Sequence, residues 1–171
     1  MNILNTKRLE LIRVSEDDAP FVFKLVNTPS WIKYIGDRGV ETLDDAKKYI
    51  LDGPVRSYRE FGFGLFLMKL KNDDIPIGMC GLLKRKSLPD VDIGFAIMPE
   101  YEKRGYTYEA SSAVMEYAEN EVGLERIIAI TTEENKVSIH LLEKLGLTFE
   151  EKLNVDEFKK EMLLYSRNFQ K

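Results

Sequence analysis

One short stretch of the sequence joins an apolar strand, a basic loop and an amphipathic helix. The apolar run 93–98 is ended by Pro99, and the segment 103–109 leads directly into a helical pattern. The first N–H groups of a helix have no partner within the helix, and the helix dipole favours negative charge there. Lys103 and Arg104 add positive charge at the same place. This arrangement predicts a site for a phosphate or pyrophosphate.

The rest of the chain alternates between strand-like and helix-like segments. We expect strands near 8–14, 63–70, 76–85, 91–98, 126–130, 148–153 and 161–165, and helices over 15–27, from 42, after 105 and over 135–145. Thr28-Pro29-Ser30 should end the first helix, 31–36 should be irregular, and Gly53-Pro54 should break or kink the second helix. The expected class is α/β (α+β), with a mixed, mostly antiparallel sheet of six to seven strands flanked by about four helices.

Length and composition restrict the class of protein. The 171 residues suit one domain over 1–171. No apolar run approaches the roughly 18–20 residues that span a bilayer, and no signal-peptide pattern begins the chain, so we expect a cytoplasmic protein and no membrane partner. The net charge of −4, with dispersed acidic residues, argues against nucleic-acid binding. The single Cys and single His predict no disulfide framework and no metal site. The oligomeric state is open, a homodimer included.

Four motifs lie in order along the chain. They are TKRLEL at 6–11, DIGFAIMPEY at 92–101, RGYTYEA at 104–110 and NKVSIHLLEKLGL at 135–147. The ordered set resembles the GNAT family of acyl-CoA-dependent N-acetyltransferases, and more narrowly its RimJ/RimL-like branch of ribosomal-protein N-acetyltransferases. The resemblance implies a GNAT fold whose sheet is splayed at the strand that ends near Met98.

The resemblance also implies that acetyl-CoA is the acyl donor. N–H groups near Ile97 and Met98 would stabilise the oxyanion, and the edge of that strand would pair with the pantetheine arm. The pyrophosphate would be held by the N–H groups of Lys103, Arg104, Gly105, Tyr106 and Thr107. Asn135 would contact the cofactor, cap its helix, or do both. The loop departs from the family pattern, because Lys103 stands where Gly is common.

Acetyl transfer to an amine requires the amine to lose its proton. Asp92 is the candidate base, since several family members carry a strand carboxylate there; the alternative is an exposed Asp on the polar face of the strand. Ser138 stands where the RimL-like branch has a Ser proposed to protonate the departing thiolate, while Leu142 replaces the Tyr of many members. A local hydrogen bond is the alternative for Ser138. Glu109 is interpreted as an acid that the first turn of a helix favours.

Trp31 and Tyr34 lie in the segment that walls the acceptor site in GNAT relatives. The alternative is a small hydrophobic cluster under a loop. We predict an N-acetyltransferase that acts on an amine, with a protein N-terminal α-amine, as in ribosomal proteins, as the acceptor. Alternatives are a small-molecule amine (a polyamine, an amino acid or an aminoglycoside) and a non-catalytic acyl-CoA-binding module.

Overall fold

An eight-stranded sheet runs through residues 4–170, the part of the chain that this computed structural model describes. Its strands are β1 (Leu4–Asn5), β2 (Leu9–Arg13), β3 (Leu65–Leu70), β4 (Pro76–Leu83), β5 (Asp92–Ile97), β6 (Arg126–Thr131), β7 (Thr148–Val155) and β8 (Lys160–Asn168). Their order is β1-β2-β3-β4-β5-β6-β8-β7, and every neighbouring pair is antiparallel except β5 with β6. The predicted mixed sheet is confirmed. It has one strand more than expected because the two-residue β1 is too short to give a pattern.

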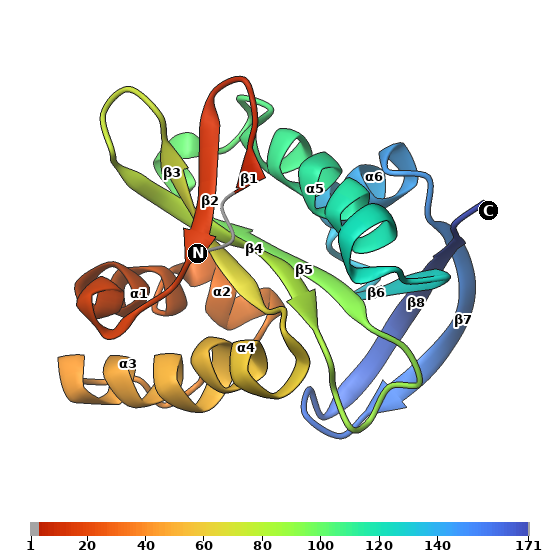
Figure 1. Cartoon of the computed structure of the whole chain (residues 1–171). Helices are drawn as coiled ribbons and strands as arrows, with labels where there is room; N and C mark the ends of the chain where they lie inside the picture. The colour runs from red at the N-terminus through yellow and green to blue at the C-terminus, as the bar shows by residue number, and fades with distance from the viewer. Residues whose placement is uncertain (1–3, 171) are drawn as a thin grey trace.

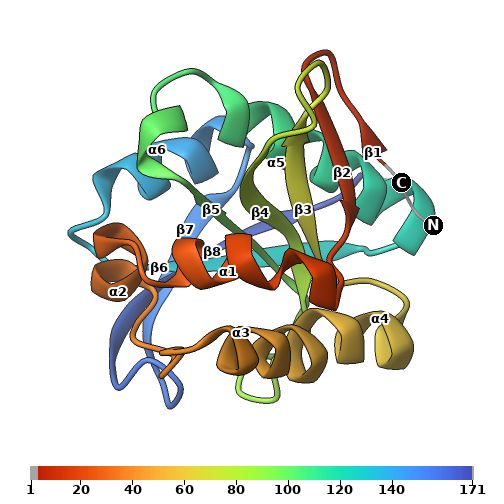
Figure 2. The same ribbon diagram turned by 90° about the vertical axis from the view of Figure 1, so that its left-hand side faces the viewer.

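Helices cover both faces of this sheet. They are α1 (Ala19–Val26), α2 (Pro29–Tyr34), α3 (Leu43–Ile50), α4 (Arg56–Phe61), α5 (Tyr106–Tyr117) and α6 (Lys136–Lys144). Figure 1 shows α1 to α4 on one side of the sheet and α5 and α6 on the other, and Figure 2 shows α1 lying in front of the strands. Because side chains alternate along a strand, Phe66 and Met68 of β3 pack towards α5 while Leu67 packs towards α1.

The segment that we expected to be irregular is a short helix. Thr28 is its N-cap: the Thr28 hydroxyl accepts a hydrogen bond from the Trp31 N–H at 3.4 Å, and Pro29 occupies the first helical position. A hydroxyl at the cap followed by proline is a signal for the start of a helix. The prediction of an irregular stretch was wrong because these residues were taken only as the end of α1.

The second predicted helix continues through Gly53 and Pro54. Its start is confirmed, since Thr42 and Asp45 form a capping box. A π-helical segment, Leu51–Val55, then connects α3 to α4 and accommodates the missing N–H of proline. Gly62 ends α4 in the left-handed conformation. No helix within residues 4–170 is both long and apolar enough to cross a membrane.

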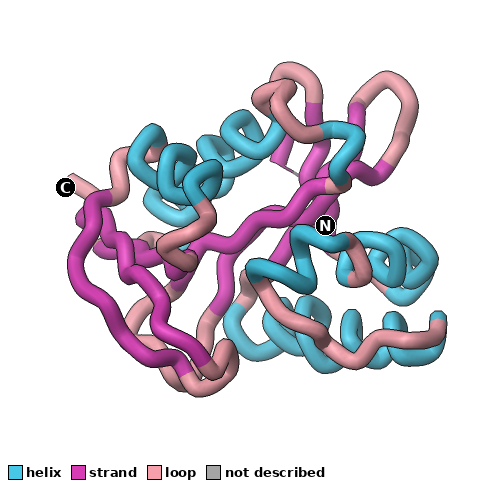
Figure 3. Tube along the Cα trace, turned by 180° about the vertical axis from the view of Figure 1, so that it is seen from behind, coloured by secondary structure: helices cyan, strands magenta, loops and turns pink. Residues whose placement is uncertain are grey.

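Strands β5 and β6 are neighbours only where they begin. Their parallel pairing joins Asp92 to Ile128, and the Ile128 N–H donates to the Val91 carbonyl at 3.1 Å. β5 stays paired with β4 along its whole length, whereas no β6 partner is found for it beyond Asp92 in the described chain. The sheet therefore splays from Asp92 towards Met98, as predicted. Figure 3 shows the curved β7–β8 hairpin at the edge of the half that begins with β6.

Candidate active site

The loop between β5 and α5 presents main-chain N–H groups at the open end of the splay. A 3-10 turn, Pro99–Tyr101, follows β5, and Gly105 is the N-cap of α5 with φ +82°. Glycine has no side chain with which to cap the helix, and no side-chain cap bond is made there. The first amides of α5 therefore remain available to an anion.

Lys103 takes up the backbone conformation that glycine has in the usual family loop. Its φ is +62°, in the left-handed region that a residue with a Cβ adopts at a cost. Lys103 therefore adopts a conformation that glycine would adopt without this cost. The ammonium group of Lys103 adds a positive charge, since the side chain is exposed at the same turn.

The first motif of the sequence anchors this loop. Glu109 of α5 accepts hydrogen bonds from the Thr6 hydroxyl at 2.6 Å, the Arg8 main-chain N–H at 2.7 Å and the Arg8 Nε at 2.7 Å. Arg8 Nη1 also donates to the Arg104 carbonyl at 3.0 Å, and its guanidinium lies 4.3 Å from the centre of the Tyr106 ring. The position of Glu109 in the first turn of the helix was predicted. Its hydrogen bonds also connect the β1–β2 connection to the start of α5, which was not predicted.

Only one of the two predicted strand amides faces the splay. The Met98 N–H donates to the Ile77 carbonyl of the β4 side at 2.8 Å, so it is not available to an oxyanion. The expectation for the Met98 amide was wrong in this respect. Main-chain groups alternate in direction along a strand. The N–H groups of Phe95 and Ile97 therefore point away from β4, into the splay.

Asp92 lies at the vertex of the splay and is almost completely buried, with 1 % of its surface exposed. The alternative of an exposed Asp is therefore wrong. Arg85 Nε donates to both carboxylate oxygens of Asp92, at 3.2 and 3.3 Å. Burial raises the pKa of Asp92 to about 6, although the charge and hydrogen bond of Arg85 lower it. A carboxyl group with such a pKa can exchange a proton near neutral pH.

Ser138 and Asn135 lie together at the start of α6. Asn135 is the N-cap, and its Oδ1 accepts the Ser138 N–H at 3.2 Å, so the expected capping role is present. Ser138 is buried and shares the inner face of α6 with Leu142, four residues on. The predicted roles of Ser138 as proton donor and of Asn135 as cofactor contact remain predictions.

The two predicted acceptor residues lie in α2 but differ in exposure. Trp31 is buried, meets the Tyr49 ring edge-on at 6.4 Å, and belongs to the apolar cluster under α1 and α3. Its Nε1 is buried without a hydrogen-bond partner in the described chain. Tyr34 is half-buried, and the Lys33 ammonium lies 5.0 Å from its ring centre. Trp31 therefore packs mainly as a core residue, and a contact of either residue with an acceptor stays a prediction.

Sequence reasoning missed a cluster that covers the vertex of the splay. The β7–β8 turn brings Glu157 to Arg85, with Nη1 to Oε2 at 3.3 Å, and to Ser87, with Oγ to Oε1 at 2.9 Å. The Phe158 ring of the same turn lies 5.2 Å from the Arg85 guanidinium and 5.8 Å from that of Arg38. These residues come from separate loops, so no local pattern could have grouped them.

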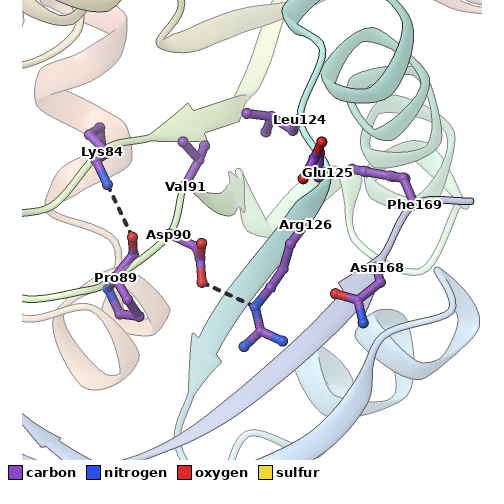
Figure 4. A pocket seen from close by; sticks show the side chains of 9 residues that line it. All are labelled: Lys84, Pro89, Asp90, Val91, Leu124, Glu125, Arg126, Asn168 and Phe169. Atoms are coloured by element: carbon purple, nitrogen blue, oxygen red, sulfur yellow. Dashed lines mark hydrogen bonds and ion pairs between the residues drawn. The ribbon is translucent and has the colours of Figure 1, made fainter. Parts of the chain in front are cut away.

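A cavity lies on another part of the molecule. A cavity of about 620 Å³ opens where β5 and β6 begin, on the side away from the loop that follows β5 (Figure 4). It is lined by Lys84, Pro89, Asp90, Val91, Leu124, Glu125, Arg126, Asn168 and Phe169. None of the predicted site residues borders it. Within residues 4–170, no group of three or more His, Cys, Asp or Glu side chains is placed to hold a metal ion.

A smaller cavity adjoins the basic loop. It measures about 210 Å³ and is lined by Lys7, Arg8, Leu70, Lys71, Asn72, Asp73 and Tyr106. Arg8 and Tyr106 connect this cavity to the N-terminus of α5, since they contact each other there. Three cationic side chains in its wall extend the positive charge of the loop and suit a ligand with several negative charges.

Comparisons with known proteins agree with this geometry. A family model described as an acetyltransferase (GNAT) domain matches residues 8–148. The uncharacterized N-acetyltransferase YnaD of Bacillus subtilis (strain 168) is 30% identical over 144 residues, which cover 84% of this chain and 81% of that protein.

Solved structures show the same fold. The crystal structure of an acetyltransferase from Agrobacterium tumefaciens C58 has a TM-score of 0.84 at 21% identity, covering 99% of this chain and 95% of that one. RimL, a ribosomal L7/L12 α-N-protein acetyltransferase solved in complex with coenzyme A, has a TM-score of 0.82 at 15% identity, covering 98% of each chain. At these identities the likeness concerns the fold alone. Because the family model spans most of the sequence, we conclude that the chain belongs to the GNAT family of N-acetyltransferases.

Proposed function

We propose that this protein transfers the acetyl group of acetyl-CoA to a protein N-terminal α-amine by direct attack of the amine on the thioester. The proposal rests on two unpaired main-chain surfaces that are continuous with each other. The free edge of β5 leads directly to the uncapped N-terminus of α5. An extended pantetheine arm can pair with a strand edge, and a pyrophosphate suits a helix N-terminus.

The residues present fit this donor. Gly105 allows close approach of the main chain, and the exposed Lys103 and Arg104 supply charge for the pyrophosphate. The N–H groups of Phe95 and Ile97 point into the splay, where one of them can stabilise the negative charge that develops on the carbonyl oxygen. Asn135, which caps α6 four residues after the end of β6, would contact the donor from the other side of the splay.

The pKa of Asp92 favours an α-amine as the acceptor. An α-amine has a pKa of about 7.7–8.0, whereas a lysine-like amine has a pKa of about 10.4. A base with a pKa of about 6 is much closer to the first value, so less free energy is needed to take the proton. In the proposed mechanism Asp92 receives the proton of the amine, and Ser138 donates a proton to the departing thiolate. The RimL likeness is compatible with an α-amine acceptor, and it concerns the fold alone.

The donor assignment is tested by Gly105→Val. A Cβ at Gly105 would lie 3.3 Å from Arg8 Nη2 and would force a side chain into the left-handed region. We expect acetyl-CoA affinity, measured by calorimetry, to fall at least about 100-fold, because the side chain also occupies the position of the pyrophosphate. Gly123→Val is the matched control, since Gly123 has φ +78° and open space around its Cβ position. Equal affinity in wild type and Gly105→Val would refute the assignment.

The catalytic assignment is tested by Asp92→Asn with saturating acetyl-CoA. We expect kcat to fall at least about 100-fold, as for loss of a general base, with donor affinity unchanged. Thiol release from acetyl-CoA with an N-terminal peptide measures this. Coenzyme A binding without turnover on any peptide or amine would instead favour the non-catalytic acyl-CoA-binding module.

A further inference from the structure

We infer that the acceptor carries a carboxylate close to its reacting amine, and that Arg38 binds this carboxylate at the mouth of the acceptor site. The inference rests on the proposed function, because it places the amine beside Asp92. It narrows the acceptor from any N-terminal α-amine to a chain whose first residues are acidic.

The first step is the position of Arg38. Its guanidinium and that of Arg85 lie against the same ring, Phe158, at 5.8 and 5.2 Å from the ring centre. Arg85 holds the buried Asp92 at the vertex of the splay. Arg38, in contrast, is exposed. A surface guanidinium and the arginine that binds the buried carboxylate therefore contact the same aromatic ring.

The second step concerns the pairing of the two arginines. Arg85 is neutralised, because it forms ion pairs with both Asp92 and Glu157. Arg38 forms no ion pair with any carboxylate among residues 4–170. Its neighbour Asp37 is instead bonded to the Gly39 N–H at 2.8 Å. The positive charge of Arg38 is therefore available to an acceptor.

The third step is the surface between the two arginines. Tyr49 is half-buried, and desolvation raises its pKa, while the charges of Arg38 and Arg85 both lower it. Tyr49 therefore lies within the field of both guanidinium groups. Trp31 packs against Tyr49 and leaves a buried indole N–H without a partner in the described chain. A guanidinium without an ion-pair partner among residues 4–170, beside an aromatic ring, suits a planar carboxylate group.

The fourth step is the reach of an acceptor chain. One residue of an extended chain spans at most about 3.6 Å. Both guanidinium groups contact the same ring, so they are separated by little more than the ring and its contacts. A carboxylate on one of the first three residues can therefore reach Arg38 while the α-amine lies beside Asp92. The same positive charge repels a polyamine, whose several ammonium groups would face Arg38.

The test uses two octapeptides that differ only in carboxylates. One has Asp at its second and third positions and the other has Asn there, so the pKa of the α-amine is similar in both. We expect wild type to favour the Asp peptide by at least about five-fold in kcat/KM, measured by thiol release, since an exposed charge pair is a modest contribution. Arg38→Gln should reduce this ratio to about one, and Arg38→Glu should reverse the preference.

Arg59→Gln is the matched control, because Arg59 is also exposed, lies on α4, and is not one of the arginines that contact the Phe158 ring. It should keep the preference of wild type. Turnover of both peptides with a ratio near one, or a ratio that Arg38→Gln leaves unchanged, overturns the inference while the proposed function stands. Turnover of spermidine but of neither peptide overturns both the inference and the α-amine acceptor.

Discussion

The proposed donor and acceptor sides of the splay are built in different ways. The donor side is mostly one continuous segment, from the end of β5 through the Lys103 turn to the first turn of α5. The acceptor side is assembled from α2, α3, the loop after β4 and the β7–β8 turn. A contiguous segment can be recognised as a motif, whereas an assembled surface is defined only by the fold. The comparison explains why a GNAT chain can be identified by its donor side while its acceptor stays open.

Two carboxylates show the same contrast in physical terms. Glu109 on the proposed donor side and Asp92 on the proposed acceptor side each bind an arginine from another segment of the chain. Burial raises the pKa of Glu109, but hydrogen bonds from Thr6 and Arg8 together outweigh it and lower the pKa. Asp92 is buried much more deeply, so burial outweighs Arg85 and raises its pKa to about 6. Hydrogen-bond donors determine the direction of the pKa shift of Glu109, whereas the loss of solvent determines that of Asp92.

The largest predicted effect is a pH dependence of stability. It shows whether burial or the ion pair with Arg85 has the larger influence on the pKa of Asp92. The folded protein holds a proton on Asp92 between its ordinary pKa of 3.8 and about 6, where the unfolded chain has lost it. The contribution of Asp92 to the free energy of unfolding therefore falls as pH rises through this window, by about 3 kcal/mol. The free energy of unfolding of wild type minus that of Asp92→Asn, measured by urea unfolding from pH 4 to 7, should therefore fall as the pH rises.

Arg85→Gln sharpens this result. Removal of the Arg85 charge leaves burial less opposed, so the fall in stability should extend to higher pH. A difference between wild type and Asp92→Asn that rises with pH would mean that the ion pair outweighs burial at this site.

The second prediction concerns the anchor of the donor loop. Glu109→Ala removes the acceptor of three hydrogen bonds, from Thr6 and Arg8. We expect a loss of about 2 kcal/mol in the free energy of unfolding, as for a few partly exposed charge-assisted bonds, and a weaker affinity for acetyl-CoA. Glu60→Ala breaks a wholly exposed pair with Arg56 and should change stability far less and affinity not at all. Equal effects of the two variants would show that the anchor contributes nothing specific.

The smallest predicted effect concerns backbone strain at Lys103. Lys103→Gly should raise the free energy of unfolding by about 1 kcal/mol, because glycine adopts φ +62° without a steric cost. Lys103→Ala loses the same charge but keeps the Cβ, so it should not be stabilised. Thermal unfolding of the pair isolates the strain, and calorimetry with acetyl-CoA isolates the charge. A Gly variant no more stable than the Ala variant would show that the turn is not strained.

The strands, the helix after Gly105 and the basic loop before it could be predicted because each depends on a local pattern. Apolar alternation, a proline stop and a basic turn are visible within a few residues of one another. The start of α2 could also have been found, since Thr28 and Pro29 form a start signal. That error came from assigning one signal to the end of the preceding helix.

Other features depend on contacts that no local pattern contains. The orientation of the Met98 N–H follows from its pairing with Ile77 in β4. The bond that Arg85 makes beside Asp92 comes from Glu157 in the β7–β8 turn, which lies more than sixty residues later. Arg38 and Arg85 can be grouped only once both are seen to contact the Phe158 ring. Charge and hydropathy indicate such residues as surface groups, so their grouping requires the fold.

The single pairing between β5 and β6, at Asp92 and Ile128, also affects how the sheet can respond to a ligand. Beyond that point no ladder within residues 4–170 joins the two halves, so the gap can widen or narrow without the loss of main-chain hydrogen bonds. An extended molecule lying in the gap would supply bonds that the protein itself lacks, and would act as the missing strand between the two halves. Occupancy by the donor should therefore stiffen the whole sheet as well as fill a site.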